Sequence, residues 1–130
     1  MPPLTSDDAL ALSKSFRDLS AAITDYRLKN ASTLSDADRK ALEDKEWALL
    51  NASTDMVTQA VGLTLDESEA AAKKVQGAAA TAEKAVKTLK EVRKVITVAA
   101  AAVGLAAAIA AKDPGAIAKN SKAVLDAATS

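Results

Sequence analysis

The chain has 130 residues and no net charge, with 17 basic and 17 acidic side chains and neither cysteine nor histidine. The absence of cysteine excludes disulfides and thiol chemistry, and the absence of histidine removes the commonest general base and metal ligand. With one phenylalanine, one tyrosine and one tryptophan, the core has to be built from aliphatic residues and from alanine, the strongest helix former. We therefore predict a single all-α domain over residues 1–130, an antiparallel helical bundle of about four helices with a C-terminal helical hairpin.

The first predicted helix covers residues 6–30, with acidic residues in its first turn, where the helix dipole favours them. Its apolar residues recur at steps of three and four, the spacing of a helix that packs against partner helices. These residues are Ala9, Leu12, Phe16, Leu19, Ile23 and Tyr26. The Asn-Ala-Ser-Thr sequence at 30–33 has turn chemistry, so we expect the helix to end there.

The second predicted helix covers residues 36–61 and begins after Ser35, a favourable N-cap residue. Two adjacent lines of apolar side chains give it a face broad enough for two neighbouring helices. The first line consists of Leu42, Leu49 and Met56, and the second of Leu50, Val57 and Val61. Trp47 lies off both lines, so it either wraps round the edge of the bundle or is an exposed contact residue. Gly62 is expected to end the helix.

The third predicted helix covers residues 65–111 and starts at a capping box in residues 64–67. Its apolar line contains many alanines, which predicts close approach to a neighbouring helix. Near residues 90–95 this line changes register, because the position expected after Leu89 is the charged Arg93. Either one long helix protrudes from a three-helix core, or the chain bends back near the register change.

Residues 95–111 form a stretch of 17 residues without a charge. A helix of this length is about 25 Å long, slightly shorter than the ~30 Å hydrocarbon core of a bilayer. The stretch is therefore either a buried helix, at the centre of a bundle or at a contact between subunits, or a membrane-active element. Its candidate interaction or membrane residues are Val95, Ile96, Val98, Ala100, Val103, Gly104, Leu105, Ala108 and Ile109. Among them Ala100, Gly104 and Ala108 have the i, i+4, i+8 spacing of small residues at which two helix backbones can approach closely.

A last, short amphipathic helix is predicted over residues 114–128, with Asp113 as its N-cap and Pro114 in its first turn. The pattern of residues 95–128 thus predicts a helical hairpin, and the first arm of this hairpin is wholly apolar. In composition this hairpin resembles the hydrophobic hairpins of bacterial α-helical pore-forming toxins; the resemblance covers these residues only and identifies no family. It implies a membrane-active, pore-forming-like protein that inserts the hairpin.

Basic residues precede the apolar stretch near one face of the predicted helix. This basic face consists of Lys84, Lys87, Lys90, Arg93 and Lys94. It is either an ordinary solvated face, with nearby glutamates as local partners, or a docking face for anionic lipid headgroups. No aromatic residues lie between the basic ones, so we do not expect nucleic-acid binding.

The two halves of the chain differ in charge. Residues 1–69 hold 7 basic and 13 acidic side chains, whereas residues 70–130 hold 10 basic and 4 acidic ones. Either the acidic helices pack alongside the basic ones, in the same chain or in a neighbouring copy, or the basic half meets an anionic membrane.

The sequence contains no arrangement that predicts chemistry. The acidic clusters lie at predicted helix starts or on an outward face, no calcium loop or di-metal pattern is present, and the serines have no histidine to activate them. We expect no catalytic residue, no metal, no cofactor and no small-molecule substrate.

The predicted function is a non-catalytic helical interaction or assembly module that associates with itself, or with another helical protein, through residues 95–111. One alternative is the membrane-active protein described above, with an anionic membrane as its partner. Another, by analogy alone, is a small inhibitor or immunity protein. The first residues do not have the pattern of a secretory signal, so we expect a cytoplasmic location, with peripheral membrane association under the membrane-active alternative.

Overall fold

A computed structural model of the chain describes residues 6–58, 68–89, 91–111 and 114–129. These residues form five α-helices: α1 (Ser6–Lys29), α2 (Asp36–Thr58), α3 (Ser68–Thr88), α4 (Val92–Ala110) and α5 (Pro114–Thr129). No strand occurs in the described residues, and the prediction of an all-α fold is confirmed. Some predictions lie outside them: Val61, Gly62, the capping box at 64–67, Lys90, Asp113, and the side chains of Ala9, Met56 and Val57.

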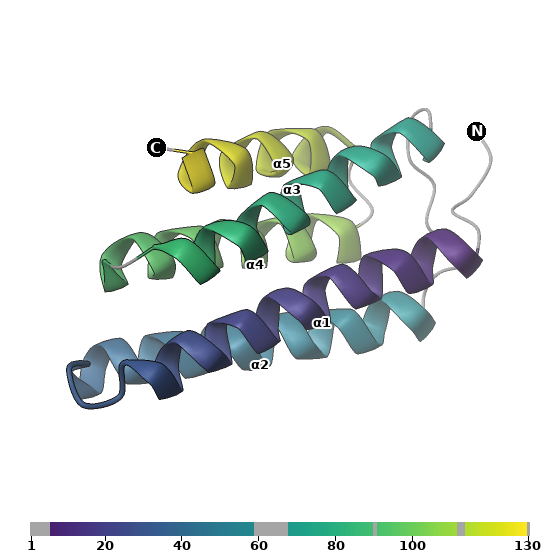
Figure 1. The fold of residues 1–130 in the computed structure, drawn as a ribbon. Coiled ribbons are helices and arrows are strands. Elements are labelled where there is room, and N and C mark those ends of the chain that lie inside the picture. Colours follow the sequence, from purple (N-terminus) through teal and green to yellow (C-terminus); the bar gives the residue numbers. More distant parts are fainter. Residues whose placement is uncertain (1–5, 59–67, 90, 112–113, 130) are drawn as a thin grey trace.

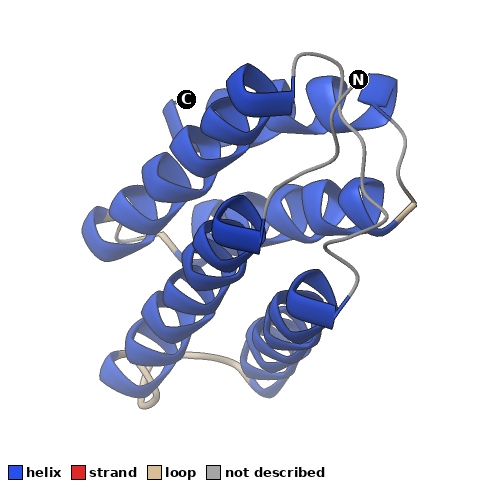
Figure 2. Cartoon of the chain, turned by 90° about the vertical axis from the view of Figure 1, so that its right-hand side faces the viewer, coloured by secondary structure: helices blue, strands red, loops and turns tan. Residues whose placement is uncertain are grey.

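The helices are arranged in layers, which Figures 1 and 2 show from two directions. The first layer consists of α1 and α2, which lie side by side. The next consists of α3, which packs against α1, and α4, which packs against α2. On their far side α5 packs against both α3 and α4. Consecutive helices run in opposite directions, as the colours in Figure 1 show. The apolar helix α4 therefore contacts α2, α3 and α5.

The third predicted helix is divided into two in the structure. The first part, α3, ends at Thr88, and α4 begins at Val92 after Glu91, whose φ of −86° and ψ of 121° are extended. The division falls at the register change, where a continued α3 would have brought Arg93 into line with its buried residues. Instead, the chain turns and Arg93 is exposed. The described residues thus contain five helices where about four were expected, and 65–111 does not form one protruding helix.

The core is built around the apolar line of α1. Every predicted position of this line whose side chain is described is buried: Leu12, Phe16, Leu19, Ile23 and Tyr26. Each large apolar side chain buried in this way stabilises the fold by about 1.5–3 kcal/mol. The contribution of α3 is mostly alanine, since its buried residues include Ala78, Ala79, Ala82 and Ala85. These small side chains allow α3 to lie close to α1 and α5.

The turn between α1 and α2 has the chemistry that its sequence predicts. The backbone N–H of Asn30 donates to Tyr26 O at 3.0 Å, and that of Leu34 donates to Asn30 O at 3.1 Å. Ser35 Oγ accepts a hydrogen bond from the backbone N–H of Asp38 at 3.1 Å. Ser35 is therefore the N-cap of α2, as predicted.

The inward face of α2 is narrower than its apolar residues suggest. Leu42 and Leu49 are buried, in agreement with their seven-residue spacing. Leu50, from the second predicted apolar line, is 39% exposed. Buried positions on this side are instead occupied by the polar residues Glu46 and Ser53. Both find partners on α1, which is why polar side chains are tolerated there.

Candidate interaction surface

The apolar helix α4 is largely covered by the rest of the chain. Most of its candidate residues are buried, namely Val95, Val98, Leu105, Ala108 and Ile109. Ile96, Val103 and Gly104 are partly buried, whereas Ala100 is exposed. The large side chains of α4 thus contribute to the core of a single chain, and its described exposed positions beyond the first turn are small residues, Thr97, Ala100 and Ala107.

The small residues of α4 also serve a contact within the chain. A Cβ atom at Gly104 would lie 2.9 Å from Asn120 Oδ1 on α5, which is closer than a carbon atom normally approaches. The Asn120 side chain is held by a hydrogen bond from its Nδ2 to Ala116 O at 2.7 Å. Gly104 therefore lets α5 approach α4, and a larger side chain there would push Asn120 away.

Among the described helices, α4 alone is long and apolar enough to cross a membrane, judged by length and composition only. The segment Val92–Ile109 has 18 residues with a mean hydropathy of 1.8. A buried helix of a soluble protein has the same composition, so this property fits both roles predicted for the stretch.

The basic face lies at the turn between α3 and α4. Lys84 and Lys87 near the end of α3 are exposed, as are Arg93 and Lys94 at the start of α4. Lys87 Nζ pairs with Glu83 Oε1 at 3.1 Å. The other three cations make no ion pair in the part of the chain that the structure describes. They are therefore accessible to an anionic partner.

A polar seam, not predicted from the sequence, joins α1 and α2. The Oγ atoms of Ser13 and Ser53 lie 2.8 Å apart, and Ser53 Oγ donates to Ser13 O at 2.9 Å. Seven residues further along α1, Ser20 Oγ donates to Glu46 O at 2.9 Å. These contacts set the register of the antiparallel pair, with residue 13 opposite 53 and residue 20 opposite 46.

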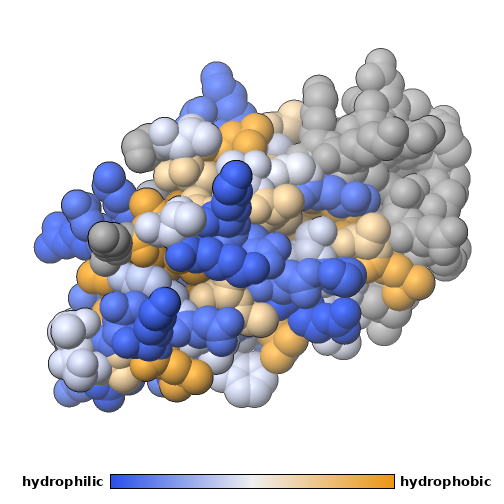
Figure 3. All heavy atoms as spheres, viewed as in Figure 1, coloured by the Kyte–Doolittle hydropathy of each residue, from blue (hydrophilic) through white to orange (hydrophobic). Residues whose placement is uncertain are grey.

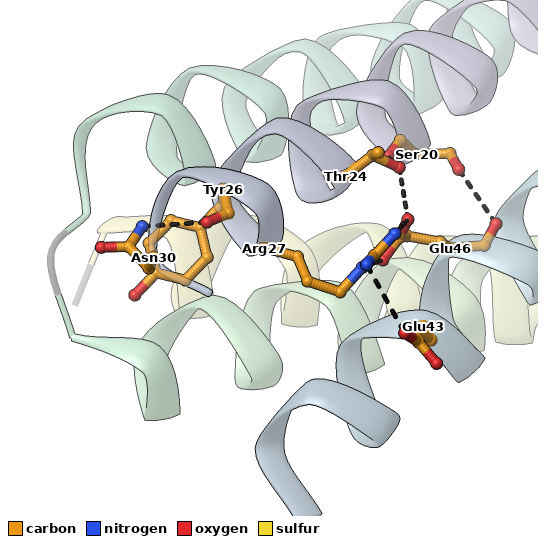
Figure 4. A network of polar contacts seen from close by, with 7 residues as sticks. All are labelled: Ser20, Thr24, Tyr26, Arg27, Asn30, Glu43 and Glu46. Carbon is orange, nitrogen blue, oxygen red and sulfur yellow. Dashed lines mark hydrogen bonds and ion pairs between the residues drawn. The ribbon is translucent and has the colours of Figure 1, made fainter. Parts of the chain in front are cut away.

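The polar seam continues into an ion-paired cluster around Glu46 (Figure 4). Arg27 Nε donates to Glu46 Oε2 at 2.6 Å and Arg27 Nη2 to Glu46 Oε1 at 3.1 Å, while Thr24 Oγ1 donates to the same carboxylate. Arg27 Nη1 also lies 3.5 Å from Glu43 Oε1. The hydrogen bond to Glu46 raises the pKa of Arg27, whereas burial lowers it. The negative charges of Glu46 and Glu43 also raise this pKa. Glu46 is thus a structural carboxylate held by its partners.

Large apolar side chains are exposed along the solvent side of this seam. Leu10 and Leu28 on α1 are 54% and 62% exposed, and Trp47 on α2 is 65% exposed. Each of these residues, like Leu50, lies one helical turn from a residue of the polar seam, so they border it. We call this surface, formed by the exposed residues of α1 and α2 beside the seam, the outer face. Of the two alternatives for Trp47, the structure shows the exposed one.

The molecular surface seen in Figure 3 carries its hydrophobic residues as small groups among hydrophilic ones. No group of three or more potential metal-ligating side chains occurs in the described residues. Comparison with protein-family models, with curated proteins and with solved structures finds no match to the chain. The function therefore has to be argued from the surfaces of the molecule.

Proposed function

We propose that this protein is a non-catalytic helical interaction module that associates with itself. The observation that carries the proposal is the exposure of Leu10, Leu28 and Trp47 on the outer face, while the large apolar residues of α4 are largely covered. Large apolar residues exposed on the same side of a molecule can be covered together by one partner, and tryptophan is enriched among the residues that dominate binding. A second copy that covers the outer face would remove these side chains from water.

In this proposal the apolar helix α4 is the internal support of the module. A contact between copies through residues 95–111 would involve mainly exposed small residues such as Ala100, because most of the larger ones are buried in the single chain. The finer architecture that we propose is an antiparallel bundle ending in the α4–α5 hairpin, and the packing of α5 against α4 supports it. The partner is a second copy of the chain; capture of another helical protein alone would count against self-association.

Light scattering of the purified protein tests this proposal. We expect a mass of about twice the 13.3 kDa of one chain, decreasing on dilution. Trp47→Ser should shift the equilibrium toward the monomer, since it removes the most exposed of the large apolar side chains. Leu125→Ser is the matched control, because Leu125 is 40% exposed but lies on α5. A mass of one chain at every concentration would overturn the proposal.

A second candidate function is insertion of the α4–α5 hairpin into anionic membranes. It is favoured by the length and hydropathy of Val92–Ile109 and by the exposed cations at the start of α4. Ala100 lies at the middle of this segment and is exposed in the folded chain. Ala100→Asp should therefore preserve the soluble fold but oppose insertion, because a charge at the bilayer centre is costly.

Flotation with anionic and with neutral vesicles tests this second function. Binding to anionic vesicles that Ala100→Asp abolishes would support insertion. Protein that stays at the bottom of the gradient with both kinds of vesicle would reject it.

A further inference from the structure

The outer face contains a continuous stripe of exposed residues along α1. Its members follow one another at steps of three or four residues, and all are exposed: Leu10, Lys14, Arg17, Ala21, Asp25 and Leu28. This spacing places the six residues on one face of the helix. The buried line of α1 faces the core, so the stripe lies on the solvent side of the same helix. Its exposure shows that no described helix covers it.

Two charged residues of this stripe, Arg17 and Asp25, are placed symmetrically about Ala21. Arg17 and Asp25 lie four residues before and four residues after Ala21, about 6 Å to either side along the helix axis. In the described part of the chain neither residue makes an ion pair, whereas the neighbouring Lys14 pairs with Asp18 at 2.8 Å. An antiparallel second α1 that crosses at Ala21 would bring each Arg17 opposite the Asp25 of the other copy.

We propose that two copies of the chain pair through α1, in an antiparallel contact centred on Ala21. This inference rests on the self-association proposed above and gives it a geometry. The two Arg17–Asp25 pairs are related by two-fold symmetry, as an interface between identical surfaces requires. The small side chain of Ala21 lets the two helices approach at the crossing. Leu28 then lies opposite Lys14 of the other copy, whose aliphatic stem can cover it.

The neighbouring helix α2 extends this contact. The hydrogen bond between Ser20 and Glu46 O places the part of α2 that contains Trp47 beside the middle of α1, next to the proposed two-fold axis. With 24 and 23 residues, α1 and α2 are each about 35 Å long, and side by side they present a face of roughly 700 Å². This is close to the ~800 Å² that each partner contributes to a standard interface. The whole outer face is therefore slightly smaller than one side of a standard interface.

Complementary charge reversals test the pairing. Arg17→Glu and Asp25→Lys each place like charges at both contacts of a homodimer, so each variant alone should dimerise about tenfold more weakly than the wild type. An equimolar mixture of the two variants should form heterodimers with wild-type affinity, because both contacts then hold opposite charges. A single chain that carries both substitutions should likewise dimerise with wild-type affinity. Native mass spectrometry resolves the three dimers, and added salt should weaken the recovery.

Lys122→Glu is the control, a charge reversal at an exposed residue of α5, on the far side of the molecule from α1. It should leave dimerisation unchanged. A wild-type dimer whose variant mixture and double variant show no recovery would overturn the α1 pairing but not self-association. A wild-type protein that remains monomeric would overturn both. Circular dichroism should show unchanged helix content in every variant, since the substituted residues are exposed and their replacements favour helix.

Discussion

Glu46 is 8% exposed and accepts hydrogen bonds from Arg27 and Thr24 across the contact between α1 and α2. Removing one partner of a shielded charged pair is costly, because the group that remains has lost its water without compensation. We predict that Glu46→Ala lowers the free energy of unfolding by about 1–3 kcal/mol, measured by urea denaturation. Asp18→Ala, which removes the exposed Lys14–Asp18 pair, should hardly move the urea midpoint. Equal effects of the two variants would mean that the cluster around Glu46 is not structural.

We expect Tyr26 to make the stability of the fold depend on alkaline pH. Burial raises the pKa of Tyr26, and the negative charge of Asp38 adds to this effect. Below about pH 10 the phenol is protonated in both states, but above it the unfolded chain ionises first. The free energy of unfolding should therefore fall as pH rises above about 10, and less steeply in Tyr26→Phe. Urea denaturation of both proteins between about pH 9 and pH 11 measures the difference. If the free energy of unfolding fell equally with pH in the wild type and in Tyr26→Phe, the raised pKa of Tyr26 would be contradicted.

At the scale of the elements, the approach of α5 to α4 depends on Gly104. Gly104→Leu should displace the Asn120 side chain and overpack the contact, which costs about 1–3 kcal/mol of stability and lowers the melting temperature. Adding Asn120→Ala should recover part of the loss, because it frees space at the contact. Gly77 on α3 is the matched control: a Cβ there meets no atom within 4 Å, so Gly77→Ala should raise the melting temperature. An unchanged melting temperature in Gly104→Leu would argue against close α4–α5 packing.

The elements could be predicted from the sequence where apolar periodicity is strong. The bounds of α1 lie within one residue of the prediction, and the described side chains of its apolar line are buried, because apolar residues at steps of three and four lie on one face of the helix. At Arg93 the register change was visible, but the local sequence does not specify in which direction the chain turns. Leu50 was predicted on the core side of α2 because hydrophobic periodicity considers only apolar residues. It does not show that α1 supplies hydrogen-bond partners for polar residues of α2.

The polar seam was missed for the same physical reason. Hydrophobic periodicity assigns serine and charged residues to the surface, and these side chains become buried only when another helix supplies hydrogen-bond partners. The seven-residue spacing of Ser13, Ser20 and Arg27, matched by that of Glu46 and Ser53, was the available signal. The outer face could not be predicted either, because it combines residues of two helices whose relative register the seam sets.

In the whole molecule, the apolar stretch of α4 and the outer face differ in how far they are exposed. The apolar stretch of α4 drew attention in the sequence because it is continuous, yet its large side chains pack inside a single chain. The outer face is discontinuous in sequence and exposed in the structure, which makes it the better candidate for contact between copies. The basic face belongs to α3 and α4 and the outer face to α1 and α2, so association with a second copy and contact with an anionic surface can be tested with different substitutions.

Emission from Trp47, the only tryptophan of the chain, during dilution of the protein tests association through the outer face most directly. In the proposed dimer a second copy would cover the indole, so its emission should lie at shorter wavelengths. On dilution the emission should shift to that of indole in water, because Trp47 is 65% exposed in the single chain. Emission from a water-exposed indole at concentrations where light scattering shows a dimer would contradict association through the outer face.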